Sequence, residues 1–243
     1  MAVKSAERTI RILEAYAAGG EPLALSELAR RVAIPVSACY GLVRTLLSRG
    51  YLYELGPRKG YYPTMRWLEQ ARLIAQRDPV LGRVSPLLEA LSAATGETVV
   101  LGKRLEIQVL YLAVVEAQNP IRYSAHAGEL KPLHSSAAGK ALLGSLGAAE
   151  RDALLRSLKL NRITANTITR REALEKDLAT GAARGWYLTR GENVPDVHAI
   201  AAPVRLASDT CAIVVAGPAH RIEAHLRSHA RRLLRACRAA EAR

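Results

Sequence analysis

The sequence predicts an α+β protein of two modules: a small N-terminal module of three helices and a β-hairpin, and a larger C-terminal module with one sheet. Three observations support this. Apolar residues recur at helical spacing through the first fifty positions. Two short β-like runs flank a turn within residues 51–63. From Glu97 onward, β-like runs alternate with helical ones, which is typical of one sheet with helices packed on it.

Composition limits the classes of protein that the chain can be. Its 243 residues are 49% hydrophobic, enough for real cores, and its net charge of +13 favours a polyanionic partner. The three cysteines are widely spaced, which indicates reduced thiols rather than a disulfide framework. We find no signal peptide and no apolar run near the roughly 18 residues that span a bilayer. These features predict a cytoplasmic protein without a membrane partner.

The first expected helix follows Ser5, which is placed to cap it. Ile10, Leu13 and Ala17 form its apolar face, with Ile12 and Tyr16 beside it, and Gly19-Gly20 ends the helix.

Two short helical patterns then fill residues 25–51 and are joined at 33–35. The first has Ser26 placed as its N-cap. The second has an apolar stripe of Cys39, Leu42, Val43, Leu46 and Leu47. Its opposite face carries Ser37, Tyr40, Gly41, Arg44, Thr45 and Ser48. A turn this short is typical of a helix-turn-helix, whose second helix enters a DNA groove, although a helical hairpin in a core would share the pattern.

A hairpin at residues 51–63 turns this unit into the winged form of the motif. Its tip, Arg58-Lys59, is placed to contact phosphates or a minor groove. Residues 1–66 hold ten basic and five acidic side chains, about +5 on a small module. We therefore expect residues 1–64 to form a winged helix-turn-helix DNA-binding domain.

Residues 65–78 read as a linker helix, and Asp78-Pro79 separates it from a second helix over 79–94. The extra apolar residues of these two helices are compatible with either a dimer interface or packing within the chain.

Residues 79–243 are expected to form the second domain. Its β-like runs are 98–101, 107–115, 121–125, 186–189, 199–204 and 211–216, with helices at 170–184 and 219–240. The last helix is rich in arginine, which fits either a solvated surface or non-specific DNA contact.

Several stretches together resemble one family. They are PLHSSAAGKALL at 132–143, ENVPDVHAIAAPV at 192–204, AGP at 216–218, Leu28-Ala29, and VSACY at 36–40. With these motifs the chain resembles the IclR-type bacterial transcriptional regulators over about residues 4–240. The resemblance implies a GAF-like effector-binding domain behind the winged helix. It also implies dimers, or pairs of dimers, on palindromic promoter DNA, and a response to small organic acids.

The chain departs from the family pattern in its recognition helix. Gly41 stands where such proteins commonly have arginine, and it costs roughly 1 kcal/mol of helix propensity. Readout of DNA is expected to depend on the remaining residues. The predicted DNA-binding residues are Ser26, Ser37, Ala38, Tyr40, Arg44, Thr45, Arg49, Arg58 and Lys59.

The ligand-binding wall departs as well. Positions that are often polar or acidic in the family read here as Ala199, Val214, Ala216 and Thr189. Lost charged contacts of about 1.5–3 kcal/mol each disfavour a very small acid, so we expect an aromatic or otherwise largely apolar organic acid. The predicted effector-binding residues are Tyr123, His134, Ala137, Ala138, Thr189, Val197, His198, Ala199, Val214 and Ala216, with Thr189 and His134 or His198 at the polar end.

The sequence gives little support for a catalytic site or a metal site. Gly139-Lys140 lacks the residues of a phosphate loop, and Ser136 and Lys140 are one position too far apart for an SxxK pair. Lys140 is expected to be a helix-surface or capping charge. His225 and His229 share a helical spacing but have no acidic third ligand, so we read them as exposed histidines. Cys39 is expected to be a small buried apolar residue, with a redox switch as the alternative.

We therefore expect a transcriptional regulator that needs no cofactor and no metal, rather than an enzyme. The competing hypotheses are an enzyme that uses the C-terminal pocket and a small-molecule-binding adaptor.

Overall fold

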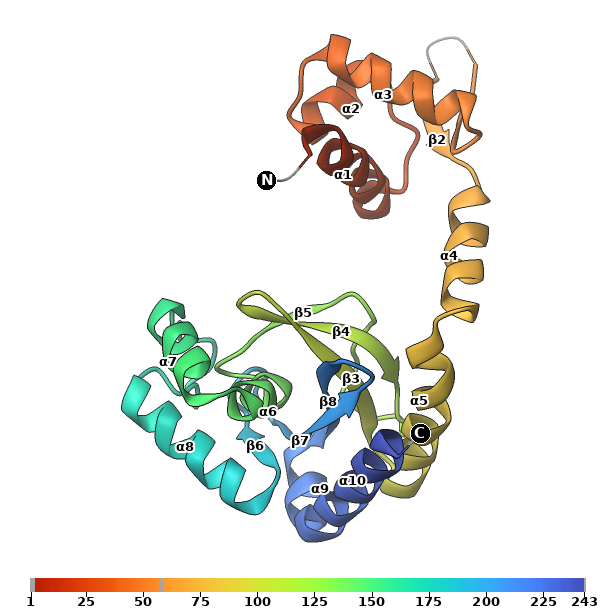
Figure 1. Cartoon of the computed structure of the whole chain (residues 1–243). Coiled ribbons are helices and arrows are strands. Elements are labelled where there is room, and N and C mark those ends of the chain that lie inside the picture. The colour runs from red at the N-terminus through yellow and green to blue at the C-terminus, as the bar shows by residue number, and fades with distance from the viewer. Residues whose placement is uncertain (1–2, 57–58, 243) are drawn as a thin grey trace. The chain divides into compact units, whose positions relative to one another are not determined.

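The computed structural model describes residues 3–56 and 59–242, and the chain divides into two compact units, Met1–Asp78 and Pro79–Arg243 (Figure 1). Each unit has its own hydrophobic core. The elements of the first unit are α1 (Lys4–Gly19), α2 (Leu25–Val32), α3 (Val36–Ser48), β1 (Leu52–Glu54), β2 (Tyr61–Pro63) and α4 (Arg66–Gln76).

The first core confirms the stripe expected for α3 but not the face expected for α1, where Ile12 and Tyr16 are buried while Ile10 and Ala17 are exposed. Cys39, Val43 and Leu46 of α3 are buried and pack with residues of α1 and α2, while Leu42 and Leu47 are half-buried. Burial also raises the pKa of the Cys39 thiol, which disfavours the reactive thiolate. Cys39 is therefore the buried apolar residue that its position in the stripe indicates.

Both serine caps expected from the sequence are wrong. Helix α1 starts at Lys4 with Val3 as its N-cap, and α2 starts at Leu25 with Ala24 as its N-cap. Ser5 and Ser26 thus occupy the second helical position, where the backbone is already helical. An N-cap needs extended backbone, which Ala24 has at φ −65° and ψ 156°.

The wing is a small antiparallel ladder beside the helices. Strands β1 and β2 pair from Leu52–Pro63 to Glu54–Tyr61, and Leu23 bridges to Tyr61. Gly60 has φ +89°, and a Cβ there would lie 2.7 Å from the Leu23 carbonyl, so only glycine fits where the wing meets that segment. Of the expected basic tip, Lys59 is exposed and Arg58 lies outside the described residues.

The first turn of helix α4 is held in place by contacts with Tyr51, the residue before β1. The Trp67 indole donates to the Tyr51 carbonyl at 3.0 Å, and the two rings lie 4.5 Å apart. Beyond this anchor α4 buries no residue, and Met65 and Ile74 are 69% and 71% exposed.

The second unit is a six-stranded antiparallel sheet in the order β5-β4-β3-β8-β7-β6. Its strands are β3 (Thr98–Leu105), β4 (Gln108–Val115), β5 (Leu130–Pro132), β6 (Tyr187–Arg190), β7 (Val197–Leu206) and β8 (Asp209–Pro218). Its helices are α5 (Pro79–Thr95), α6 (Ala137–Ser145), α7 (Ala148–Ser157), α8 (Arg171–Arg184), α9 (Ala219–Ala224) and α10 (Leu226–Glu241).

The sheet separates two cores because successive side chains of a strand point to opposite faces. Val99 and Leu101 pack with α5 and α10, whereas Val100 packs with α6 and α8. Figure 1 shows these two pairs of helices on opposite sides of the sheet. The expected fold class, a winged helix-turn-helix followed by a GAF-like α+β domain, is confirmed.

Two local predictions in this unit fail, and two elements were not predicted. Residues 121–125 form no strand, because the edge of β4 is already paired with β5. The sequence reading missed the short β5 and helix α7. The expected closing helix is divided at His225 into α9 and α10.

His229 is also not the exposed histidine expected from the sequence. It is 4% exposed on the inner face of α10, and neither ring nitrogen has a hydrogen-bond partner among the described residues. Burial is the main cause that lowers its pKa; nearby His225 and Arg232 act in the same direction, and Glu97 opposes them.

This burial predicts a pH dependence of stability. Because the folded-state pKa of His229 lies below its unfolded value of about 6.5, its neutral form is favoured in the fold, and stability is lost as pH falls below 6.5. We expect His229→Leu to reduce the loss of unfolding free energy between pH 7 and pH 5. Urea unfolding at both pH values measures this. His225→Leu, at an exposed position, is the control, and equal slopes for all three proteins would contradict the prediction.

Candidate functional site

One candidate surface is the outer face of α3. The six residues expected there are exposed, and the Arg44 guanidinium lies 6.0 Å from the centre of the Tyr40 ring. The Thr45 hydroxyl donates to the Gly41 carbonyl at 2.9 Å. Of the other predicted residues, Ser26, Arg49 and Lys59 are exposed, and Ala38 is half-buried.

The cations around this face differ in their partners. On α2, Arg30 and Arg31 both bond Glu27, and these bonds lower the pKa of its carboxyl group. Within the described residues, Arg44 and Arg49 form no ion pair. The positive charge of the α3 face is therefore available to an outside anion.

The second candidate site is a cavity in the other unit, with an empty volume of about 380 Å³. It lies between the start of α6 and the strands β4, β6, β7 and β8. Its lining residues are Tyr111, Tyr123, Ser136, Ala137, Ala138, Thr189, Asn193, Val194, Val197, Ala199, Val214 and Ala216. This volume includes space that is open to solvent.

The structure brings eight of the ten predicted effector residues to this cavity and leaves two histidines outside it. His134 is buried and its Nε2 lies 3.0 Å from the Asn161 carbonyl; burial lowers its pKa, which favours the neutral ring. His198 points to the opposite face of β7 from Ala199, and its Nδ1 lies 3.4 Å from Glu223 Oε2.

Sequence reasoning missed four lining residues: Tyr111, Ser136, Asn193 and Val194. Asn193 and Val194 lie inside the 192–204 stretch that indicated the family, so the signal was present but was not assigned to the cavity. Asn193 Nδ2 donates to Ser135 Oγ at 3.1 Å, which fixes its amide at the wall. The Ser136 side chain caps α6 by accepting from the Gly139 N–H.

Among the described residues, no charged side chain lines the cavity, so its polarity comes from other groups. The hydroxyls of Tyr111, Tyr123 and Thr189 and the Asn193 amide can donate to a ligand oxygen. Backbone N–H groups at the start of α6 add the positive end of the helix dipole. Such a site can hold a carboxylate without a cation.

Lys140 is not the surface charge expected from the sequence. Its side chain has no exposed surface, and Nζ lies 2.6 Å from Glu192 Oε1 and 2.8 Å from Asp177 Oδ2. Burial is the main cause that raises the pKa of Glu192, and it outweighs the opposing effect of the Lys140 charge. The ammonium thereby ties α6 and α8 to the segment that carries Asn193.

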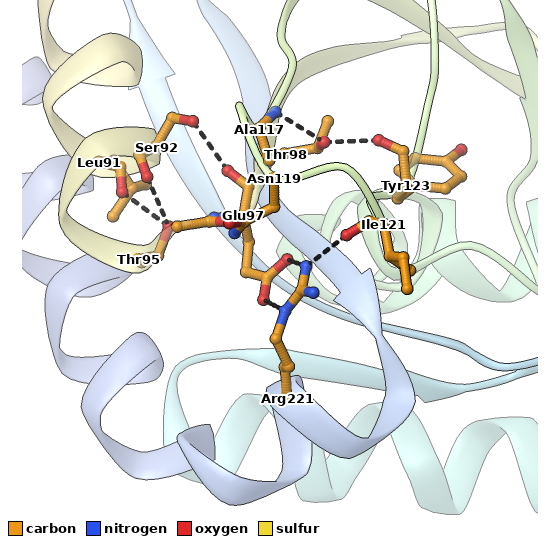
Figure 2. Close-up of polar contacts among 11 residues, drawn as sticks. Leu91, Ser92, Thr95, Glu97, Thr98, Ala117, Asn119, Ile121, Tyr123 and Arg221 are labelled. Carbon is orange, nitrogen blue, oxygen red and sulfur yellow. Dashed lines mark hydrogen bonds and ion pairs between the residues drawn. The ribbon is translucent and has the colours of Figure 1, made fainter.

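A polar network fastens the segment over residues 116–123 to the start of β3 (Figure 2). Glu97 is 2% exposed, and its two oxygens accept from Arg221 Nε at 2.7 Å and Nη2 at 2.9 Å. Arg221 Nη2 also donates to the Ile121 carbonyl at 2.9 Å. The Thr98 hydroxyl donates to the Tyr123 carbonyl at 2.5 Å. Tyr123, a cavity residue, is thus connected to the start of β3.

Two classes of site find no support in the part of the chain that the structure describes. No three His, Cys, Asp or Glu side chains come together there as a metal site. Within the same ranges, no helix combines the length and the apolar character needed to cross a membrane.

Comparison with known proteins assigns both units. Residues 5–56 match the IclR helix-turn-helix domain, and residues 73–242 match the C-terminal domain of bacterial IclR transcriptional regulators. The HTH-type transcriptional regulator BhcR of Paracoccus denitrificans is 32% identical over 222 residues, which are 90% of this chain and 79% of the relative.

Solved structures share the fold. IclR of Thermotoga maritima superposes with a TM-score of 0.78 at 22% identity, covering 98% of this chain and 96% of the other. An IclR homologue from Microbacterium hydrocarbonoxydans, solved with 4-hydroxybenzoate, superposes with a TM-score of 0.80 at 24% identity and 98% coverage of both chains.

The curated relatives are named as regulators and not as enzymes, so the enzyme hypothesis is set aside. The chain therefore belongs to the IclR family of bacterial transcriptional regulators.

Proposed function

We propose that this regulator binds palindromic promoter DNA through α3 and that a small, largely apolar organic acid in the cavity controls the binding. The observation that supports the DNA contact is the amphipathic character of α3, whose buried stripe faces the core while Tyr40, Arg44 and Thr45 are exposed. In a helix-turn-helix the second helix lies in the major groove, where such side chains meet base edges. The wing tip, with Lys59, then contacts the flanking backbone.

Arg44→Ala tests this contact. If Arg44 reads a base, we expect specific binding to weaken by about 1–3 kcal/mol, with preference lost at one position of each half-site. Fluorescence anisotropy with the chain's upstream intergenic DNA, and with single-base variants of it, measures both effects. Arg72→Ala is the matched control, because Arg72 is exposed on α4 and is paired with Glu69. Equal losses of affinity on all DNA sequences would show that Arg44 contacts a phosphate and reads no base.

The proposed class of effector rests on the walls of the cavity. Alanine and valine make up most of its lining residues, two tyrosines flank it, and no cation among the described residues lines it. An aromatic acid gains free energy by burying its ring against such walls, whereas a very small acid carries the same carboxylate with little apolar surface to bury there. The structure of the Microbacterium homologue with 4-hydroxybenzoate supports the same class for this chain.

Isothermal titration with benzoate, 4-hydroxybenzoate, glyoxylate and pyruvate tests the effector class. We expect an aromatic acid to bind and the two small oxo acids to fail. Ala199→Phe fills the cavity and should abolish binding, and Ala207→Phe, at an exposed turn, should leave it unchanged. Tight binding of glyoxylate or pyruvate without an aromatic ligand would contradict the proposal.

The proposed regulator acts in the cytoplasm as a homodimer or as a pair of dimers. A twofold axis places two copies of α3 one helical turn of DNA apart, or a multiple of it, which matches a palindrome. The exposed apolar residues of α4 supply a surface for association. The effector shifts DNA affinity only as far as it binds one arrangement of the two units better than another.

A further inference from the structure

Helix α10 has two opposite faces of different character. Its buried residues are His229, Ala230, Leu233, Cys237 and Ala240. Four exposed arginines, Arg227, Arg231, Arg235 and Arg238, form what we call the arginine face. At about 100° per residue these four lie within an arc of roughly 80°, on the side away from the buried residues. They span 12 residues, a row about 17 Å long.

The arginine face has no internal counter-charge. None of its four side chains forms an ion pair with a described residue. Glu241, the carboxylate of the same helix, accepts instead from the Arg205 backbone N–H at 2.9 Å. Glu223, in the preceding helix, is bonded by Arg190 at 2.9 Å.

Some other arginines of the same unit are paired with carboxylates. Arg104 pairs with Glu150, and Arg171 pairs with Glu175 across one helical turn. On α10 the same one-turn spacing places Arg227, Arg231 and Arg235 beside one another, where like charges destabilise a helix. Arg227 also lies in the first turn, next to the positive end of the helix dipole. The free protein therefore bears a cost that an outside anion would remove.

We propose that the arginine face is a second duplex-binding surface, which contacts phosphates independently of base sequence. This inference rests on the proposed DNA-binding function but concerns a different element. A duplex offers a regular row of phosphates, one per 3.4 Å on each strand, and each guanidinium can bond a phosphate through two N–H groups. The row of four arginines matches such a repeating anion better than it matches a single acidic side chain.

The test uses the full chain with Arg227, Arg231, Arg235 and Arg238 all changed to Gln. The probe is a labelled 40-base-pair duplex of random sequence, titrated at several KCl concentrations. Each lost phosphate contact lowers the slope of log affinity against log salt by about 0.9, so we expect a fall of about 3–4. The midpoint of thermal unfolding should stay equal or rise, because the repulsion within α10 is removed. That readout separates a lost contact from a damaged fold.

A matched control removes the same net charge elsewhere. Arg156, Lys159, Arg170 and Lys176 are exposed on and beside α7 and α8, and changing all four to Gln should lower the slope by less than 1. Equal slopes for the two quadruple variants, or no fall in the α10 variant, would overturn the inference.

The Arg44→Ala variant separates this inference from the proposed function. If the inference holds, this variant keeps most of the random-duplex slope while its specific binding to the promoter weakens. If the unchanged protein shows no preference for the promoter, but the α10 variant still has the lower salt slope, the proposed function is refuted and the inference stands. If the protein prefers the promoter, but the α10 variant has the same salt slope as the unchanged protein, the inference is refuted and the proposed function stands.

Discussion

Replacing Lys140 by methionine is expected to lower the free energy of unfolding by about 3–5 kcal/mol at pH 7, the cost of removing one partner of a buried ion pair. Methionine has a similar length but no charge. It would leave the Glu192 carboxylate, whose side chain is 9% exposed, without its cation. Asp177, whose side chain is 29% exposed, keeps access to water and adds less to the cost. Urea unfolding followed by circular dichroism measures the loss.

The sign of the pH dependence checks the cause. Burial already raises the pKa of Glu192 above its ordinary value, and loss of Lys140 would raise it further. A raised carboxyl pKa means that stability is complete below the unfolded pKa and is lost as pH rises through the folded one. Lys140→Met should therefore be less destabilising at pH 5 than at pH 8. The double variant Lys140→Met with Glu192→Gln should recover much of the loss.

A loss below about 1 kcal/mol at pH 8 would contradict this account, because it is the size expected of an exposed pair. Such a result would mean that the Lys140 charge contributes no more to stability than an exposed surface charge does.

Local patterns explain which parts of this fold the sequence predicts well. The stripe of α3 depends only on helical spacing, and Cys39, Val43 and Leu46 are buried where that spacing places them. The same rule applied to β7 would have excluded His198, because its neighbours Val197 and Ala199 both face the cavity. Strand alternation is thus a signal that the sequence contained and that the residue prediction did not use.

Long-range contacts explain the failures. The main partner of Lys140 lies 52 positions away, so nothing near it in the sequence shows that its charge is paired in the interior. The apolar run at 121–125 resembles a strand, but which strand takes the edge of β4 is decided by the whole sheet. Residues 121 and 123 are instead held through their carbonyls by the side chains of Arg221 and Thr98.

Arg221→Ala should be the second strongly destabilising change, again by about 3–5 kcal/mol, because it leaves the buried Glu97 carboxylate unpaired. The carboxylate has little freedom to move toward solvent. It packs so closely against Gly217 that a Cβ at that position would overlap it. Urea unfolding gives the size of the loss, and Arg221→Met combined with Glu97→Gln, which removes both charges while keeping similar volumes, should restore most of it.

The same substitution should have a local effect that a general loss of stability would not produce. Arg221 holds the Ile121 carbonyl, and Thr98 holds the Tyr123 carbonyl two residues later (Figure 2). The double variant keeps the core neutral but still lacks the donor to Ile121. We therefore expect amide hydrogen exchange to become faster over residues 117–125 in both variants, while exchange in β7 and β8 recovers in the double variant. Unchanged protection over 117–125 in the double variant would show that Thr98 alone positions Tyr123 at the cavity, and that the bond from Arg221 to Ile121 adds nothing to the wall of the effector site.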